Sequence, residues 1–232
     1  MMVSVIIPTY NYGKYIMEAI ESILSQTHQD FEILIVDDGS TDNTKSIVTR
    51  IASPKIRYII TEHFGIAHAR NVGIQNSKGN YIAWLDADDI WTQEKLEKQL
   101  EYLMKHDDCE VVFCICRNFV DEGNTELTQR QKELLSADVS YAFPSGLYRK
   151  EIFEKVGLFT EKLEYAEDTE WYYRAQVIGL DMKHRLDEIC YLRRIHDGNL
   201  SQSHQIVLNG LKSAAIAIRS VIKKSKVSGE NI

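Results

Sequence analysis

The sequence predicts a three-layer α/β/α fold, in which helices cover both faces of a doubly wound, mostly parallel β-sheet. Two features of the sequence lead to this prediction. Apolar runs of strand length alternate along the chain with segments whose apolar residues recur at the spacing of one helical face. Several runs are apolar at consecutive positions, as expected of strands that are buried on both faces. Such alternation is typical of parallel sheets, whose ligands bind at the carboxyl ends of the strands.

The first half of the chain contains four predicted strand-helix units. Each strand is a short run rich in β-branched residues that ends at a polar or proline-containing turn. Each following helix places its apolar residues three or four positions apart. The predicted strands are residues 3–7, 31–36, 55–60 and 81–85, and the predicted helices are residues 15–24, 41–51, 66–75 and 95–104.

The second half of the chain is less regular. The predicted strands are residues 110–116 and 188–192, the predicted helices are residues 149–156 and 164–179, and residues 142–148 turn back towards the sheet. Residues 121–138 are polar and weakly patterned, which indicates either a mobile excursion or a short surface helix. Residues 193–201 form a polar loop of the kind that closes over a ligand.

A last helix is predicted over residues 206–224. Its apolar face consists of Leu208, Leu211, Ala215, Ile218 and Ile222. Packing of this face on the domain is favoured over contact with a membrane surface or a partner, because the basic residues near its end also suit a helix C-terminus. Peripheral membrane contact through this helix stays open as the alternative.

Composition narrows the functional classes. The 232 residues suit one domain, and 34 acidic against 27 basic residues give a net charge of −7, so nucleic acid is not an expected partner. The four cysteines lack paired C-x-x-C spacing and are expected to be reduced core thiols. No apolar run reaches the roughly 18 residues of a membrane-spanning helix, and a cytoplasmic location is expected.

The segment Asp86-Ala87-Asp88-Asp89 directly follows the fourth predicted strand. Carboxylates at the end of a buried strand must be solvated, paired or bound to a cation. With one residue between them, Asp86 and Asp88 can converge on one hard cation that also holds phosphate oxygens. Alone, the segment favours an acidic turn that caps the helix starting near Thr92. Thr9 and Asp38 also follow the carboxyl ends of predicted parallel strands, so they are expected to lie at the same edge of the sheet as this segment. Their proximity favours a metal and diphosphate site instead.

Five short motifs occur in a characteristic order. They are Val5-Ile6-Ile7-Pro8-Thr9-Tyr10-Asn11, Val36-Asp37-Asp38-Gly39-Ser40-Thr41-Asp42, Ala69-Arg70-Asn71-Val72-Gly73, Asp86-Ala87-Asp88 and Glu167-Asp168. Together they resemble the family 2 glycosyltransferases, which have the GT-A fold, over roughly residues 3–200. Five ordered motifs are far more specific than any one of them. The resemblance implies inverting transfer of a sugar from a nucleoside diphosphate sugar, most often a uridine one, with Mn²⁺ or Mg²⁺.

The resemblance also implies roles for individual residues. Pro8, Thr9, Tyr10 and Asp38 are expected to hold the base and ribose of the nucleotide, and a carboxylate at Asp38 suits uracil because it accepts the imide N–H. Arg70 is expected to contact the nucleotide or its diphosphate, where a cationic donor binds well.

The remaining implied roles concern the metal and the base. Asp86 is expected to face the ribose and the metal, and Asp88 to be the stronger metal ligand, while Asp89 caps the following helix. Asp168 is expected to be the general base that takes the proton of the acceptor hydroxyl; its alternative role is a carboxylate stabilised by a helix N-terminus. His196 is expected either to bind the metal or to be a surface or capping group.

The resemblance divides the expected single domain, residues 1–232, into three parts. Residues 1–118 are the nucleotide-binding half, residues 119–204 the acceptor-binding and catalytic-base half, and residues 205–232 the C-terminal helix. The acceptor stays open among glycans, lipid-linked glycans, peptides and small molecules. Two other functions are weighed. One is a non-catalytic module that binds a nucleotide sugar. The other is a sugar-nucleotide nucleotidyltransferase, which would need a glycine-rich, basic loop after the first strand that this sequence matches poorly.

Overall fold

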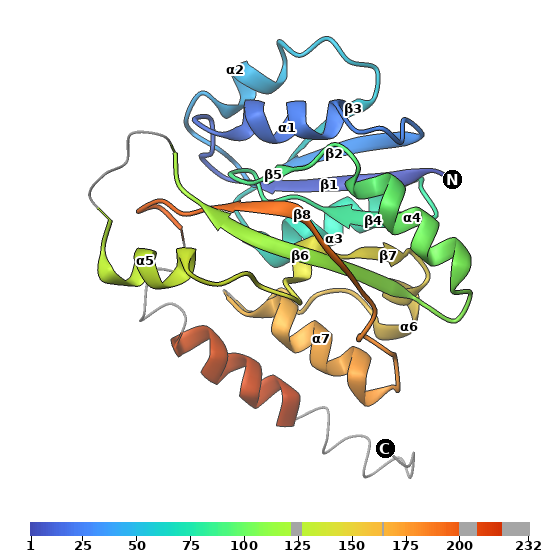
Figure 1. Cartoon of the computed structure of the whole chain (residues 1–232). Helices are drawn as coiled ribbons and strands as arrows, with labels where there is room; N and C mark the ends of the chain where they lie inside the picture. Colours follow the sequence, from blue (N-terminus) through green and yellow to red (C-terminus); the bar gives the residue numbers. More distant parts are fainter. Residues whose placement is uncertain (122–126, 164, 200–207, 220–232) are drawn as a thin grey trace.

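A computed structural model of the chain describes residues 1–121, 127–163, 165–199 and 208–219. Its strands are β1 (Val3–Thr9), β2 (Phe31–Asp37), β3 (Ile56–Ile60), β4 (Tyr81–Trp84), β5 (Ile90–Trp91), β6 (Val111–Phe119), β7 (Leu147–Arg149) and β8 (Arg185–Arg194). Its helices are α1 (Ile16–Leu24), α2 (Thr44–Val48), α3 (Ile66–Asn76), α4 (Lys95–Lys105), α5 (Gln129–Leu135), α6 (Ile152–Val156) and α7 (Glu167–Val177), with a 3₁₀ turn η1 (Phe143–Ser145). The strands form one sheet in the order β3-β2-β1-β4-β7-β6-β8-β5 (Figure 1).

The first four strands of this order run parallel. In the register, Val3 of β1 lies opposite Phe31 of β2 on one side and Tyr81 of β4 on the other. Consequently the carboxyl ends of β1, β2 and β4 meet at one edge of the sheet. This confirms the expectation that Thr9, Asp38 and Asp86 share a rim.

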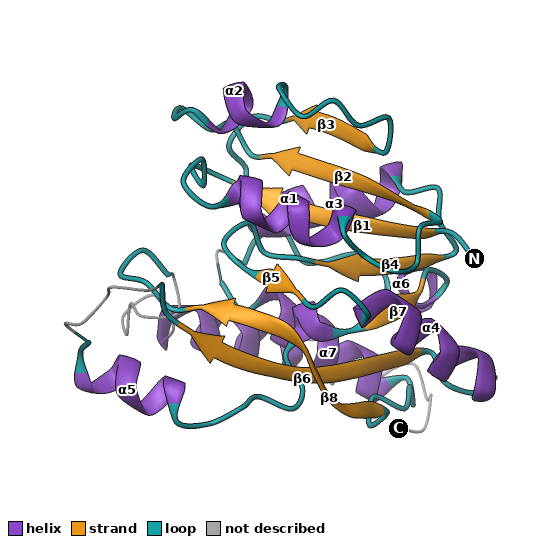
Figure 2. Ribbon diagram, turned by 45° about the horizontal axis from the view of Figure 1, so that its top comes forward, coloured by secondary structure: helices purple, strands orange, loops and turns teal. Residues whose placement is uncertain are grey.

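Two apolar cores cover the two faces of the sheet. Alternation along β1 sends Val5 and Ile7 to the core that contains residues of α1 and α4, whereas Ile6 joins the core that contains residues of α3, α6 and α7. The three layers are visible in Figure 2. The predicted three-layer, doubly wound and mostly parallel α/β/α fold is therefore confirmed.

The second half of the sheet departs from the prediction in several strands. β7 lies between β4 and β6 and is antiparallel to both, and the unpredicted strand β5 pairs antiparallel with β8. β6 and β8 are longer than predicted, and α6 begins at Ile152 because Arg149 belongs to β7. Within the polar segment 121–138, α5 confirms the short helix; its N-cap Thr128 and Gln131 form a reciprocal capping box.

The C-terminal helix is described over residues 208–219, and its expected packing face is wrong. Gly210 and Ala214 are buried, whereas Leu208 and Leu211 are 38% and 45% exposed. A side chain at position 210 would place its Cβ 2.6 Å from Cβ of Tyr165, so glycine lets the helix backbone approach that residue. Close approach at Gly210 therefore sets the orientation of the helix; Ile222 lies outside the described residues.

Two further expectations concern the chain as a whole. The four cysteines are buried and free, which confirms that they are core thiols. Within the described ranges, no helix is both long and apolar enough to cross a membrane.

Candidate active site

A cleft of about 1250 Å³ lies at the carboxyl ends of the parallel strands. Residues from both halves of the chain line it. They include all the residues predicted for the site: Pro8, Thr9, Tyr10, Asp38, Arg70, Asp86, Asp88, Asp168 and His196. The structure thus brings these residues together, while the role of each one stays a prediction.

Asp88 is held by the segment that follows β8. Its Oδ2 lies 2.9 Å from Nε2 of His196 and accepts a hydrogen bond of 3.0 Å from the Asn199 side chain. Nδ1 of His196 accepts a 3.1 Å bond from the N–H of Gly198, so the ring proton that faces Asp88 resides on Nε2. His196 therefore orients the Asp88 carboxylate.

Asp89 does not cap the following helix, and that expectation is wrong. Its carboxylate is buried and accepts hydrogen bonds from the Tyr191 hydroxyl, at 2.7 Å, and from the backbone N–H of Arg194, at 2.8 Å. Burial raises its pKa well above the ordinary value, and the nearby charge of Asp88 adds to this. Asp89 instead ties the acidic segment after β4 to strand β8.

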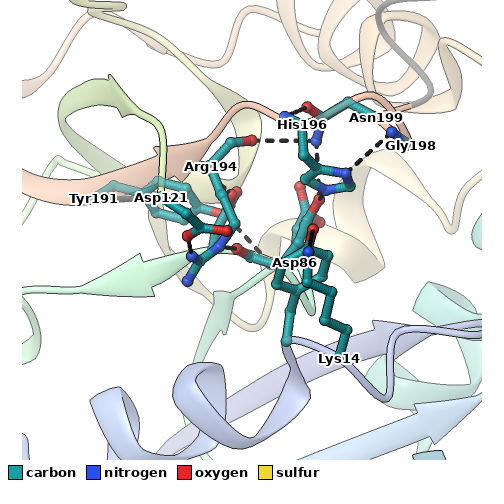
Figure 3. Close-up of polar contacts among 11 residues, drawn as sticks. Lys14, Asp86, Asp121, Tyr191, Arg194, His196, Gly198 and Asn199 are labelled. Carbon is teal, nitrogen blue, oxygen red and sulfur yellow. Dashed lines mark hydrogen bonds and ion pairs between the residues drawn. The ribbon is translucent and has the colours of Figure 1, made fainter. Parts of the chain in front are cut away.

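Arg194 is a structural residue that the sequence did not reveal. Its buried guanidinium donates to the backbone carbonyl of Asp88 at 2.9 Å and to Glu18 at 2.6 Å. It also donates to the carboxylate of Asp121 (Figure 3). These contacts join the acidic segment to α1 and to the chain after β6. A run of two arginines in a predicted polar loop gives no sign that one of them is buried.

Asp86 is open to the cleft, with its side chain 35% exposed. Burial raises its pKa to about 6, and Asp88 raises it further while Arg70 opposes the shift. Its backbone N–H also lies 3.3 Å from the Tyr191 hydroxyl. The same tyrosine therefore contacts both ends of the acidic segment.

Arg70 is buried and joins the two halves of the chain. Its guanidinium forms a 2.5 Å ion pair with Glu167 at the start of α7 and lies 3.7 Å from Oδ1 of Asp86. Burial raises the pKa of Glu167, and Arg70 opposes that shift. These contacts make Arg70 a positioning residue for Asp86 and for the start of α7. The expected contact with the diphosphate stays a prediction.

Asn71, the neighbour of Arg70, strengthens the same junction. Its side-chain amide donates to the Phe159 carbonyl at 3.0 Å and accepts from the Phe159 N–H at 2.9 Å. It also donates to Glu161 at 2.8 Å. The segment that leads into α7 is thereby fixed to α3, which places Asp168 in the first turn of α7 beside the cleft.

The end of the cleft that is expected to bind the nucleobase lies between the turns that follow β1 and β3. Asp38 accepts hydrogen bonds from the N–H groups of Phe64, at 3.0 Å, and Gly65, at 2.8 Å. Thr9 is buried beside it, and its Oγ1 has no hydrogen-bond partner among the described residues. A buried hydroxyl without a partner is rare in native proteins, so this hydroxyl is available to a water or a ligand in the cleft.

Comparison with known proteins agrees with this geometry. The model of glycosyl transferase family 2 matches residues 4–176. The chain belongs to that family. Transfer of a sugar from a nucleotide sugar is accordingly the class of reaction that the family and the similar structures support.

Relatives of this family 2 glycosyltransferase match most of its length. An uncharacterized glycosyltransferase of Rickettsia typhi is 34% identical over 239 residues, covering 96% of this chain and 72% of the relative. Chondroitin synthase of Pasteurella multocida is 31% identical over 225 residues, covering 90% of this chain and 23% of the synthase. This chain therefore spans less than a quarter of the synthase.

Solved structures share the architecture. The 1–349 fragment of S. aureus TarS in complex with UDP has a TM-score of 0.70 at 25% identity, covering 94% of this chain and 65% of that one. The mannosyltransferase PcManGT from Pyrobaculum calidifontis, solved with GDP-Man and Mn²⁺, has a TM-score of 0.70 at 23% identity, covering 94% of this chain and 64% of that one. These likenesses confirm the GT-A fold of the glycosyltransferase.

The metal-binding capacity of the glycosyltransferase rests on few side chains. Among residues 1–121, 127–163, 165–199 and 208–219, no group of three or more His, Cys, Asp or Glu side chains is placed to hold an ion. Asp86 and Asp88 nevertheless offer oxygen ligands at the cleft. One or two carboxylates suffice when substrate phosphates and waters supply the other ligands, so these residues fit a cation bound together with a diphosphate.

Proposed function

We propose that this glycosyltransferase transfers a sugar from a uridine diphosphate sugar to an acceptor hydroxyl, with inversion at the anomeric carbon. The observation that carries this proposal is that every residue predicted for the nucleotide, the metal and the base lines one cleft. A carboxylate at Asp38 suits the imide N–H of uracil, and TarS, a similar structure, was solved with UDP and with UDP-GlcNAc. The acceptor is a glycan, a lipid-linked glycan, a peptide or a small molecule.

Asp86 and Asp88 are proposed to hold Mn²⁺ or Mg²⁺ together with the diphosphate of the donor. When bound, such an ion stabilises negative charge on the departing diphosphate. His196 is proposed to orient Asp88 instead of binding the ion, because its Nε2 carries the proton shared with the carboxylate. Arg70 fixes the positions of Asp86 and Glu167 relative to each other, because its guanidinium lies close to both carboxylates.

Asp168 is proposed to be the general base. The oxygen of the acceptor hydroxyl forms a bond to the anomeric carbon as the bond from that carbon to the diphosphate oxygen breaks. The electron pair of the broken bond leaves with the diphosphate, and the hydroxyl proton passes to Asp168. A base on the face opposite the leaving group makes the transfer inverting. The position of Asp168 in the first turn of α7 supports this role, because its half-buried side chain lines the cleft, where an acceptor hydroxyl can reach it.

Calorimetric titration of the protein with a panel of nucleotide sugars tests the proposal. We expect UDP-sugars to bind in the presence of Mn²⁺, with slow hydrolysis of the bound donor in the absence of an acceptor. Asp88→Ala is expected to weaken the binding of UDP with Mn²⁺; equal affinity with and without Mn²⁺ contradicts the metal site. Binding with neither hydrolysis nor transfer to any acceptor assigns the chain to the non-catalytic alternative.

A further inference from the structure

A histidine side chain occupies the base-binding end of the cleft. The ring of His63 stacks on Tyr10 with centroids 4.0 Å apart and planes inclined by 19°. Its Nδ1 lies 2.8 Å from Oδ2 of Asp38 and 3.1 Å from the backbone carbonyl oxygen of the same residue. Because both neighbouring atoms are acceptors, Nδ1 carries a proton and donates it to Asp38.

These two contacts are the contacts proposed for the uracil of the donor. The imidazole of His63 and uracil are both flat rings that can stack on Tyr10 and donate an N–H to Asp38. One stacking surface and one carboxylate edge cannot serve two rings at once. We infer that His63 fills the nucleobase subsite of the donor-free protein and is displaced when a nucleotide binds; this inference rests on the proposed function.

The displacement requires the side chain to move and leaves the backbone in place. Asp38 holds the N–H groups of Phe64 and Gly65, and the Thr61 N–H donates to the Asp37 carbonyl at 2.8 Å, so the turn is fixed on both sides of His63. In contrast, the side chain of His63 is 58% exposed. Rotation about its own bonds therefore carries the ring into solvent, where water replaces the hydrogen bond it loses.

Gly39 explains how the turn comes so close to Asp38. Its φ of +81° suits glycine, and a Cβ at this position would lie 3.3 Å from the backbone N of His63. The glycine after Asp38 thus permits the approach that brings His63 within reach of the carboxylate. Once the ring has left, Oδ2 of Asp38 keeps the bond from Gly65 and regains an acceptor site for the base.

Displacement lowers the apparent affinity for the donor, because only the fraction of molecules with an open subsite binds. A closed form held by one ring stack and one hydrogen bond predicts that His63→Ala tightens UDP binding about 3- to 30-fold. The effect is specific to ligands that carry a base. Inorganic pyrophosphate with Mn²⁺ engages only the proposed metal end of the cleft, so its affinity is expected to stay within about twofold.

Calorimetry of the wild-type protein, His63→Ala and a control, His28→Ala, with UDP and Mn²⁺ tests the inference. His28 contacts the backbone oxygens of Met1 and Asp30 and lies outside the cleft lining, so its variant is expected to match the wild type. Tighter UDP binding to His63→Ala alone supports displacement. Unchanged or weaker UDP binding overturns it, the weaker case meaning that His63 contacts the base directly. If UDP binds to neither wild type nor variant, the proposed function fails as well.

A spectroscopic measurement on the wild-type chain, with Tyr10→Ala as its control, is independent of affinity. In the donor-free protein, the Tyr10 ring current is expected to shift the NMR signal of the His63 Cε1 proton, and Tyr10→Ala is expected to abolish that shift. Saturation with UDP is expected to return the signal to the position of a solvent-exposed histidine. A signal that keeps its shifted position at saturation overturns the displacement.

Discussion

Two pairs of neighbouring carboxylates line the cleft, Asp88 with Asp89 after β4 and Glu167 with Asp168 at the start of α7. Within each pair, one member is bonded to a strand or a helix of the scaffold, whereas Asp88, although also buried, is bonded to side chains of the loop that follows β8. Asp89 accepts from Tyr191 and from a backbone N–H, and Glu167 pairs with Arg70. The other members, Asp88 and Asp168, are the ones proposed to act on substrates. On the proposed function, adjacent acidic residues in a motif divide into one that stabilises the site and one that serves its chemistry.

The pairs differ in how the buried member is neutralised. Glu167 faces a full positive charge that is itself buried, whereas Asp89 is held by a hydroxyl and an amide N–H. Removing one partner of a buried ion pair leaves an uncompensated charge, which costs more than the loss of a neutral hydrogen bond. Substitutions of the substrate-facing members should therefore lower activity, and substitutions at the anchoring members should lower the free energy of unfolding. The loss of unfolding free energy should be larger for the contacts of Glu167 than for those of Asp89.

The largest effect is expected for the substrate-facing member of the second pair. Asp168→Asn keeps the shape of the side chain and removes the base, so turnover is expected to fall about 10²- to 10⁴-fold. Donor affinity is expected to stay nearly intact, and the free energy of unfolding to change by about 0.5 kcal/mol or less. Steady-state kinetics with a UDP-sugar and urea unfolding measure these quantities. Near-normal turnover removes Asp168 from the base role.

The anchoring member of the same pair is expected to act on stability. Glu167→Gln leaves the buried guanidinium of Arg70 without its closest charge and is expected to lower the free energy of unfolding by about 3 to 5 kcal/mol. The matched control is the double variant Glu167→Leu with Arg70→Met, which removes both charges and is expected to recover most of the loss. Urea unfolding measures each variant. A loss under about 1 kcal/mol for Glu167→Gln would show that Asp86 alone compensates Arg70.

Much of the fold followed from local pattern. The strands at residues 3–7, 31–36 and 81–85 were predicted within two residues of their ends, because apolar periodicity and turn residues are local signals. β5 has two residues, Ile90 and Trp91, too few to show a period. The insertion of β7 between β4 and β6 is a pairing of distant segments, which no local pattern encodes.

The sequence predicted which strand-end residues line the cleft, but it did not predict which distant residues hold the buried carboxylates in place. Residues that end parallel strands meet at one edge, so the grouping of Thr9, Asp38 and Asp86 followed from topology. The partners of the buried carboxylates are distant in sequence: Arg70 and Glu167 are 97 residues apart. Asp89 was assigned to the adjacent helix because its true partners in β8 are more than 100 residues away.

Weakening the bonds that hold Asp89, the anchoring member of the first pair, is expected to lower the free energy of unfolding less than Glu167→Gln does. Tyr191→Phe removes the hydroxyl that donates to Asp89 and accepts from the Asp86 N–H, while the Arg194 N–H still donates to Asp89, and the expected loss is about 1 to 2 kcal/mol. Tyr141→Phe is the matched control, because it removes a hydroxyl bond to the Lys183 carbonyl from a side chain that is 48% exposed. The control is expected to lose about 0.5 kcal/mol or less in urea unfolding. A loss for Tyr191→Phe as large as that for Glu167→Gln would erase the difference between the two pairs.

The smallest effect concerns pH and the open carboxylate of Asp86. Its pKa of about 6 in the folded protein lies above the ordinary value of 3.8, so the folded state binds more protons than the unfolded state between these pH values. The stability of the wild type relative to Asp86→Asn is therefore expected to fall as pH rises from 4 to 6, and to level off above 7. Because the side chain is 35% exposed and screened by solvent, the fall is expected to be about 1 kcal/mol. Urea unfolding of both proteins from pH 4 to 7 measures it. A difference that rises with pH would mean that Arg70 outweighs burial and lowers the pKa of Asp86 below its ordinary value.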